Sequence, residues 1–260
     1  MYKTLLILNC SEKSGVGFLL IFAAHFDNLT KFNSINVLTG QILKQLDNIH
    51  ELISVRLLTP TAYVLRMTRR GLPFKAGQHL LLGKAGSIHN REYSVYSGEQ
   101  DDFFEVLIKE VDEGMVSKQL KKLKSGEKVQ IEGPLGFFTI DPEVVNTGKF
   151  LFVATGSGIA PFHCFSRSYS QLNYTLLHGV RYAEEAYERN DYPKKRHILC
   201  TSSGDGGDFS GRVTDYLRAN PVSPDTHCYL CGNFNMIHEV FEILELQGVP
   251  AEQVHAEVYF

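Results

Sequence analysis

The sequence predicts two folded domains, an antiparallel six-stranded β-barrel over residues 49–148 and an α/β domain with a parallel sheet over residues 149–260. Short runs with alternating apolar residues fill the first region, and longer apolar runs alternate with helical stretches in the second. Turn-forming residues at 133–136 and the Asp141-Pro142 pair separate the two textures. Residues 1–48 show no sustained period, so we leave them unassigned and expect them to be poorly ordered.

The barrel prediction rests on six short runs, separated by turns rich in Gly, Pro and Ser. Because such alternating strands bury one face and pair antiparallel, six of them in about 85 residues predict a barrel. The runs are 52–58, 63–68, 79–82, 92–96, 103–111 and 128–132.

The second domain has apolar runs that do not alternate, which is typical of parallel strands buried on both faces. A helix expected over 235–247 places Ile237, Val240, Phe241 and Leu244 on one face and ends at Gly248. The expected strands are 150–154, 174–179, 197–201, 227–231 and 254–260.

The composition is that of an ordinary globular chain, with 43% hydrophobic and 21% charged residues among 260. A formal net charge of -3 does not favour nucleic acid as a partner. No run reaches the roughly 20 apolar residues of a membrane span, and the apolar run 17–24 has no clear basic lead-in of a signal peptide. Five scattered cysteines, an odd number, indicate free thiols and a cytoplasmic location.

Two segments have the residue types that bind phosphates. The run 154–161, Ala-Thr-Gly-Ser-Gly-Ile-Ala-Pro, follows an expected strand and opens a helix, so its glycines would let the backbone approach a pyrophosphate. A plain strand–helix turn is the alternative, since the third glycine of the common dinucleotide fingerprint is missing. The segment 114–117, Gly-Met-Val-Ser, precedes an expected helical stretch at 118–123 and suits either an anion or a capped surface helix.

Arg91, Tyr93 and Ser94 lie on an expected barrel strand, with Arg91 and Tyr93 on one face and Ser94 on the other. An arginine can hold a diphosphate, a tyrosine ring can stack on a flat cofactor and a serine can hydrogen-bond a ring nitrogen, although an ordinary strand would look the same. Cys228 and Cys231 form a C-x-x-C without a second pair, so we expect no metal site. The same holds for His178 and His238, for which we expect structural roles.

The order of six motifs resembles the ferredoxin–NADP reductase family. The match covers about 50–260, and the length and terminus resemble most the bacterial ferredoxin/flavodoxin–NADP reductases. The motifs are Arg91-x-Tyr93-Ser94, Gly114-x-x-Ser117, Gly133-Pro-Leu-Gly136, Thr155-Gly-x-Gly-x-Ala-Pro161, Cys231-Gly-Asn233 and Glu257-Val-Tyr259.

The resemblance implies an FAD site in the barrel. There Arg91 would bind the diphosphate, Tyr93 would stack on the isoalloxazine, and Ser94 would hydrogen-bond near the reactive nitrogen. Backbone amides would wrap the pyrophosphate, and the C-terminal aromatic residues would cover the FAD. The residues concerned are Met115, Val116 and Ser117 for the amides, and Tyr259 and Phe260 for the cover.

The resemblance also implies an NADP site. Thr155 would lie near both flavin and nicotinamide, with Gly156 beside it, and Cys231 and Glu257 would join Ser94 at the hydride-transfer site. Arg181 and Arg212 match basic residues that hold the adenosine 2′-phosphate, whereas Ser202 stands where the bacterial pattern has a further arginine. Two arginines favour NADP, and the missing one leaves NAD open.

The function that follows is an enzyme of the ferredoxin/flavodoxin–NADP⁺ reductase type, which exchanges electrons between NADPH and a transient one-electron partner, ferredoxin or flavodoxin. An NADH-linked reductase component of an oxygenase system and a non-catalytic electron-transfer subunit are the alternatives. A lysine face beside the pyrophosphate segment suits an acidic ferredoxin, although a solvated helix surface explains it equally simply. That face comprises Lys118, Lys121, Lys122 and Lys124.

Overall fold

The structure is a computed structural model, and it describes residues 48–259. The predictions made for residues 1–47 and for Phe260 lie outside the described residues.

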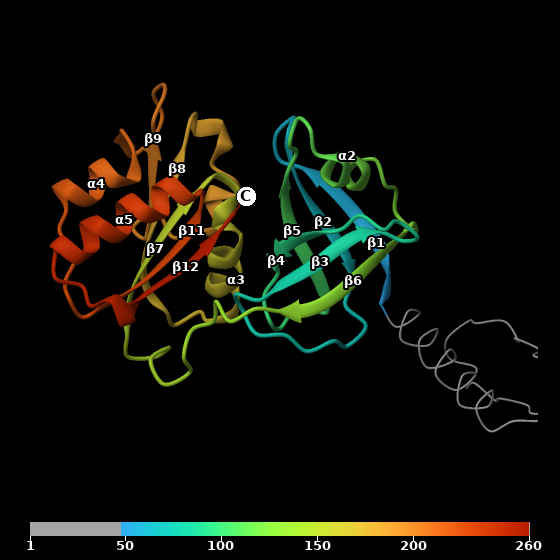
Figure 1. Cartoon of the computed structure of the whole chain (residues 1–260), viewed down its shortest axis with the longest axis horizontal. Helices are drawn as coiled ribbons and strands as arrows, with labels where there is room; N and C mark the ends of the chain where they lie inside the picture. Colours follow the sequence, from blue (N-terminus) through green and yellow to red (C-terminus); the bar gives the residue numbers. More distant parts are fainter. Residues whose placement is uncertain (1–47, 260) are drawn as a thin grey trace, which may run out of the picture. The chain divides into compact units, whose positions relative to one another are not determined.

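The first part of the described chain forms the expected six-stranded antiparallel sheet (Figure 1). The strands follow the order β4-β3-β6-β1-β2-β5. Val95 bridges Val106, and the Tyr96 amide donates to the Glu105 carbonyl at 2.7 Å, so the edge strands β4 and β5 meet and close the barrel. The elements are β1 (Ile49–Leu57), β2 (Ala62–Thr68), β3 (His79–Lys84), β4 (Arg91–Ser94), β5 (Phe103–Lys109), α2 (Met115–Lys121) and β6 (Lys128–Leu135).

The second part is a six-stranded parallel sheet in the order β10-β9-β8-β7-β11-β12. The strand β10 was not predicted, because two residues are too short to show a period. The elements are β7 (Lys149–Thr155), the 3₁₀ turn η1 (Gly156–Ile159), α3 (Ala160–Ser168), β8 (Asn173–Val180), η2 (Ala183–Glu185), η3 (Arg189–Asp191), β9 (His197–Thr201), β10 (Phe209–Ser210), α4 (Val213–Ala219), β11 (Thr226–Gly232), α5 (Phe234–Leu246), η4 (Ala251–Gln253) and β12 (Val254–Val258).

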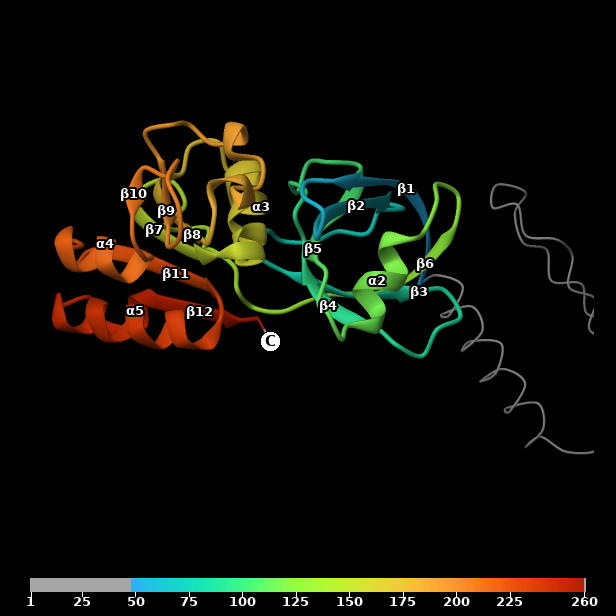
Figure 2. The same cartoon turned by 90° about the horizontal axis from the view of Figure 1, so that it is seen from above.

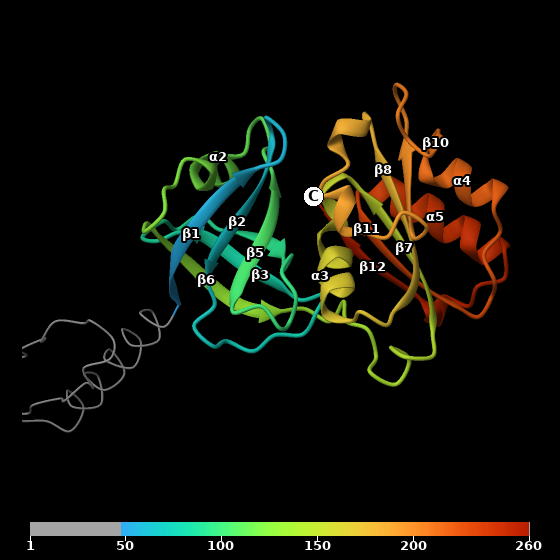
Figure 3. The ribbon, with the colours of Figure 1, turned by 180° about the vertical axis from the view of Figure 1, so that it is seen from behind.

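Helices cover both faces of the parallel sheet (Figure 2). α4 and α5 pack on one face over Val153, Leu177 and Leu230, and α3 packs on the other face through Phe162 and Phe165. The α3 face shares its core with the barrel, since a Cβ added at Gly77 in the β2–β3 loop would lie 2.8 Å from the Phe165 ring. Figure 3 shows this helix from behind, next to the strands of the barrel.

Three predicted boundaries or faces differ in detail. The helix expected at 118–123 begins earlier, at Met115, with Gly114 as its extended N-cap. Phe241 is 37% exposed and lies on the flank of α5, because the buried stripe follows Met236, Val240 and Ile243 instead. The last strand ends at Val258 rather than reaching the terminus.

Candidate functional site

Three predicted site residues meet at the carboxyl edge of the parallel sheet, where open α/β sheets bind ligands. Thr155 ends β7, and Cys231 on β11 pairs with Ala154 on one side and with Glu257 of β12 on the other. Asn233 caps α5 and donates its backbone and side-chain N–H groups to Thr155 Oγ1 at 3.2 and 3.3 Å. The sheet therefore fixes the predicted threonine, thiol and carboxylate on adjacent strands.

Glycines let the predicted turn and the end of β11 approach each other. A Cβ at Gly158 would lie 2.4 Å from the Cys231 carbonyl oxygen, and one at Gly232 would lie 2.1 Å from Thr155 Oγ1. Both separations are far below van der Waals contact, so any larger residue would push the turn away from the strand. Gly156 has φ +53 and open space around it, which leaves its side of the turn accessible.

The barrel reaches this edge through Ser94. Its Oγ donates to Glu257 Oε2 at 3.0 Å and accepts from the Tyr259 hydroxyl at 2.7 Å. The Tyr259 amide in turn donates to the Gly232 carbonyl at 2.8 Å, although this residue lies beyond the end of β12. Residues more than 160 positions apart in the sequence thus form one hydrogen-bonded group.

His79 belongs to the same group, and the sequence analysis missed it. It lies opposite Ser94 in the β3–β4 pair, and its Nδ1 is 3.5 Å from Glu257 Oε1. The contact with Glu257 raises the pKa of His79, with burial acting in the opposite direction. A Cβ at Gly136 would lie 2.8 Å from His79 Nδ1, so the last glycine of the Gly-Pro-Leu-Gly motif leaves room for this ring, although a glycine alone does not indicate which side chain fills that room.

Burial keeps the neighbouring titratable groups uncharged. It raises the pKa of the Cys231 thiol well above its usual range, and Glu257 adds to the shift. The Tyr259 hydroxyl is affected in the same way, first by burial and then by Cys231 and Glu257. Cys231 is therefore a neutral thiol in this structure, and Tyr259 remains a hydrogen-bond donor.

The residues expected around FAD lie on β4 and differ in their exposure. Arg91 is exposed, Tyr93 is half-buried and Ser94 is buried. The Arg91 guanidinium donates to the Asn90 carbonyl at 2.8 Å and makes no ion pair with a carboxylate in residues 48–259. Burial raises the pKa of Tyr93 to about 12, so its ring stays neutral.

The Gly-Met-Val-Ser segment begins α2, where Val116 and Ser117 are buried and Met115 is 63% exposed. Met115 lines a cavity of about 420 Å³ together with Lys84, Lys118 and Lys122. Of the predicted lysine face, Lys118 and Lys122 line this cavity, while Lys121 lies 3.4 Å from Glu110 and Lys124 is exposed. The four lysines therefore do not form one continuous face, because only Lys118 and Lys122 line the cavity.

The three residues expected around a 2′-phosphate follow neighbouring strands. Arg181 comes after β8, Ser202 after β9, and Arg212 caps α4 after β10. All three are exposed, and neither arginine makes an ion pair within the described residues. The Glu185 carboxylate accepts from the Arg181 amide at 3.0 Å and contacts Lys109 of the barrel at 3.3 Å.

His178, for which the sequence analysis expected a structural role, contacts the glycine turn. It is fully buried, and its Nε2 donates to the Gly156 carbonyl at 3.0 Å. Burial lowers the pKa of His178 to about 3, so the ring is neutral and holds the glycine turn through its hydrogen bond to Gly156. His238, by contrast, is exposed and lies 3.7 Å from Glu242.

One group of side chains among the described residues has the spacing of metal ligands, and it was not predicted. It consists of His163, Glu188 and Asp191, whose ligand atoms lie within 4.8 Å of one another.

Within residues 48–259, none of the helices has both the length and the apolar character of a membrane span.

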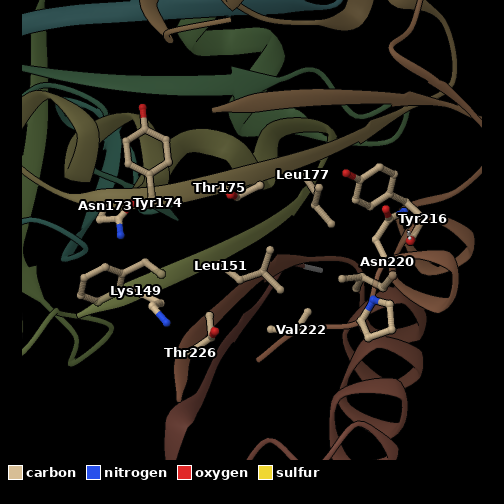
Figure 4. A pocket seen from close by; sticks show the side chains of 13 residues that line it. Lys149, Leu151, Asn173, Tyr174, Thr175, Leu177, Tyr216, Asn220, Val222 and Thr226 are labelled. Atoms are coloured by element: carbon tan, nitrogen blue, oxygen red, sulfur yellow. Dashed lines mark hydrogen bonds between the residues drawn. The ribbon is translucent and has the colours of Figure 1, made fainter. Parts of the chain in front are cut away.

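A cavity of about 320 Å³ lies at the opposite edge of the parallel sheet (Figure 4). Residues at the amino ends of β7 and β8, among them Lys149 and Asn173, line it together with Tyr216 of α4. It lies at the end of the sheet away from Thr155, Cys231 and Glu257, so it is separate from the predicted site.

The comparisons with known proteins agree with both halves of the fold. Residues 61–140 match the family model of the oxidoreductase FAD-binding domain, and residues 152–241 match that of the oxidoreductase NAD-binding domain. Since the first match covers the barrel strands β2 to β6 and the second covers most of the parallel sheet, FAD and a nicotinamide dinucleotide are the cofactors of this chain.

Individual relatives come from more than one branch. Ferredoxin–NADP reductase B of Sorangium cellulosum is 29% identical over 80% of this chain and 96% of its own length. The toluate 1,2-dioxygenase electron transfer component of Pseudomonas putida is 27% identical over 72% of this chain, which spans only 59% of that protein. A ferredoxin–NADP⁺ reductase from Neisseria gonorrhoeae, solved with bound FAD and NADP, superimposes with a TM-score of 0.73 and 25% identity over 82% of this chain and 98% of that one.

Proposed function

Because the chain belongs to the ferredoxin–NADP reductase family of FAD- and NAD(P)-binding oxidoreductases, we propose that it takes a hydride from NADPH and passes the electrons singly to ferredoxin or flavodoxin. The main support for this proposal is a contact between the two halves of the fold. Ser94 of the barrel lies within hydrogen-bonding distance of Glu257 at the carboxyl edge of the parallel sheet. A flavin held by the barrel strand and a nicotinamide held at that edge would therefore meet at these two residues.

The barrel offers FAD a charged and an aromatic contact. The guanidinium of Arg91, which makes no ion pair within residues 48–259, would hold the diphosphate, and the neutral Tyr93 ring would lie on the isoalloxazine. The first amides of α2, at Met115 to Ser117, would donate to phosphate oxygens. Lys118 and Lys122 add positive charge at the cavity beside that helix, whereas Lys84 already pairs with Glu127 at 3.6 Å. When bound, FAD supplies the chemistry, since it accepts a hydride and releases the electrons one at a time.

Near the expected flavin ring, Ser94 and Glu257 share the proton of the serine hydroxyl in a hydrogen bond. The Ser94 hydroxyl has a single proton and donates it to Glu257, so a flavin nitrogen that accepts from Ser94 would compete with that carboxylate. His79 lies on the other oxygen of Glu257 and would help to hold the carboxylate in place. Cys231, Thr155 and Gly156 would border the nicotinamide, and Tyr259 and Phe260 would cover the flavin.

The choice of NADPH rests on Arg181 and Arg212, which face solvent without carboxylate partners among the described residues. Ser202 lies between them in the chain and can donate a hydrogen bond to phosphate or to a ribose hydroxyl. A guanidinium binds phosphate with charge-assisted hydrogen bonds, whereas an unphosphorylated ribose gives it no such partner.

The FAD-loaded protein tests the proposal in two assays. In the first, NADPH and NADH each reduce a dye acceptor, and in the second, ferredoxin or flavodoxin carries the electrons to cytochrome c. We expect faster dye reduction with NADPH and transfer through at least one carrier. If neither NADPH nor NADH supports turnover, the protein would be a non-catalytic electron-transfer subunit instead.

An NADH-linked reductase component of an oxygenase system is the second candidate. Ser202, in place of a third basic residue, favours it, and so does the likeness to the toluate dioxygenase component. Its signature would be NADH as the faster coenzyme and little transfer to ferredoxin or flavodoxin in the same assays.

A further inference from the structure

One buried histidine joins the helix after the glycine turn to the strand that carries Ser94. His163 on α3 is 1% exposed, and its Nδ1 lies 2.7 Å from the Tyr96 carbonyl oxygen of the barrel. Its Nε2 lies 3.0 Å from Asp191 Oδ2 in η3. The imidazole also stacks on the Tyr96 ring, with centroids 3.7 Å apart and planes 9° from parallel.

Both ring nitrogens of His163 face hydrogen-bond acceptors. A carbonyl oxygen accepts only, and an ionised carboxylate does the same. The His163 contact is the largest cause that lowers the pKa of Asp191, which keeps this carboxylate ionised. The ring therefore meets both acceptors through its two nitrogens, and its face stacks on the Tyr96 ring.

Glu188, two arginines and Tyr192 lie around the pair of His163 and Asp191. Glu188 pairs with Arg56 of β1, and Arg167 on the same helix pairs with Asp101 at 3.0 Å, so both arginines already have partners. Tyr192 meets the His163 ring edge-on with centroids 5.9 Å apart, and burial keeps its hydroxyl neutral. A divalent ion bound by His163, Glu188 and Asp191 would lie next to the Arg56 guanidinium, which disfavours a metal there.

We infer that His163 is a positioning residue for hydride transfer: as a joint held by its two hydrogen bonds and its stacking on Tyr96, it sets the spacing between the Ser94 strand and the coenzyme-binding turn. Tyr96 lies two residues after Ser94, and α3 directly follows η1, whose Gly158 packs on Cys231. The joint thus connects the two elements that would carry flavin and nicotinamide. Hydride transfer requires reacting atoms about 3–3.5 Å apart, so a small change in this spacing is costly. This inference rests on the proposed function.

Two substitutions and a matched control test the joint. His163→Leu removes both hydrogen bonds, and Asp191→Asn replaces the carboxylate by an amide of the same size that can still hydrogen-bond the ring. The control is His50→Leu, because His50 is equally buried and bonds the Thr68 carbonyl at 2.6 Å, but entirely within the barrel. Should His163→Leu fail to fold, Asp191→Leu addresses the same contact at an exposed position.

The readouts are the single-turnover rate of flavin reduction at saturating NADPH, the KM for NADPH, the FAD content, the melting temperature, and amide hydrogen exchange in segments 91–97 and 156–168. We expect His163→Leu to slow flavin reduction by about tenfold or more with little change in KM, and to speed exchange in both segments. Asp191→Asn should keep most of the rate, and His50→Leu should lose melting temperature only.

An unchanged rate and unchanged exchange in His163→Leu would overturn the joint, as would a stoichiometric metal ion whose removal by chelator speeds exchange in the same segments. If the wild-type protein reduces no dye with NADPH or NADH, the proposed function fails, and hydrogen exchange alone then decides whether His163 holds the two elements together.

Discussion

At the scale of single residues, the pair His79–Glu257 predicts a pH-dependent stability. Because contact with Glu257 raises the pKa of His79, the protonated ring is favoured in the folded state. This contribution is fully present below the unfolded pKa near 6.5 and is lost as the pH rises through the raised pKa of the folded state. Glu257→Gln should therefore lower the free energy of unfolding by up to about 1 kcal/mol at pH 6 and by less at pH 9.

Urea denaturation at the two pH values measures this difference. A His79→Gln background provides the control, since Glu257→Gln should then have the same effect at both pH values. A pH-independent loss in the otherwise wild-type chain would mean that Glu257 stabilises the fold through Ser94 alone.

Arg212 carries the prediction on coenzyme choice. Charge-assisted hydrogen bonds contribute roughly 1.5–3 kcal/mol each, so Arg212→Ala should raise the KM for NADPH by about tenfold or more and leave that for NADH nearly unchanged. Arg218 is a matched control on the same helix, because its guanidinium already pairs with Glu239 at 2.6 Å. Equal loss with both coenzymes after Arg212→Ala would identify a structural arginine.

At the scale of elements, the chain beyond β12 is predicted to hold the cofactor rather than the fold. Tyr259 donates its amide to Gly232 and its hydroxyl to Ser94, and aromatic contacts stabilise a partner by about 0.5–1.5 kcal/mol beyond burial. Deleting Tyr259 and Phe260 should weaken FAD retention or change the coenzyme KM, with the melting temperature of the FAD-loaded protein nearly unchanged. Fluorescence of released FAD and steady-state kinetics measure these effects, and Tyr259→Phe isolates the hydroxyl.

Elements with a strong local period were predictable, and short or tertiary features were not. The barrel strands show apolar alternation and the five long strands of the parallel sheet show continuous apolar runs, whereas β10 has two residues and pairs only because β9 lies beside it. Motif order predicted that Ser94, Cys231 and Glu257 belong to one site, but no local pattern places His79 against Glu257 or His163 against Tyr96. Those contacts depend on how strands and helices pack, and the partners are far apart in the sequence without a characteristic number of residues between them.

At the scale of the whole molecule, the described barrel and parallel sheet are linked by polar contacts near the predicted site. Besides Ser94–Glu257, Lys109 pairs with Glu185 beside Arg181, and Arg56 pairs with Glu188. Ion pairs with exposed members are weakened by salt. We therefore expect added salt to change the rate of flavin reduction at saturating NADPH less in Lys109→Ala, which has already lost its ion pair, than in Lys149→Ala, a control whose ion pair with Asp225 lies within one domain.

Residues 1–47 are predicted to be dispensable for FAD binding. The first barrel strand begins at Ile49, the FAD-binding family match begins at residue 61, and none of the predicted cofactor contacts precedes Arg91. A chain that starts at Asn48 should therefore purify yellow with the same ratio of FAD to protein and a similar rate of dye reduction as the full chain. Absorbance spectra and the dye assay measure both. Loss of FAD or of solubility in the shortened chain would show that the N-terminal segment is an integral part of the fold, because every residue of the described barrel would still be present.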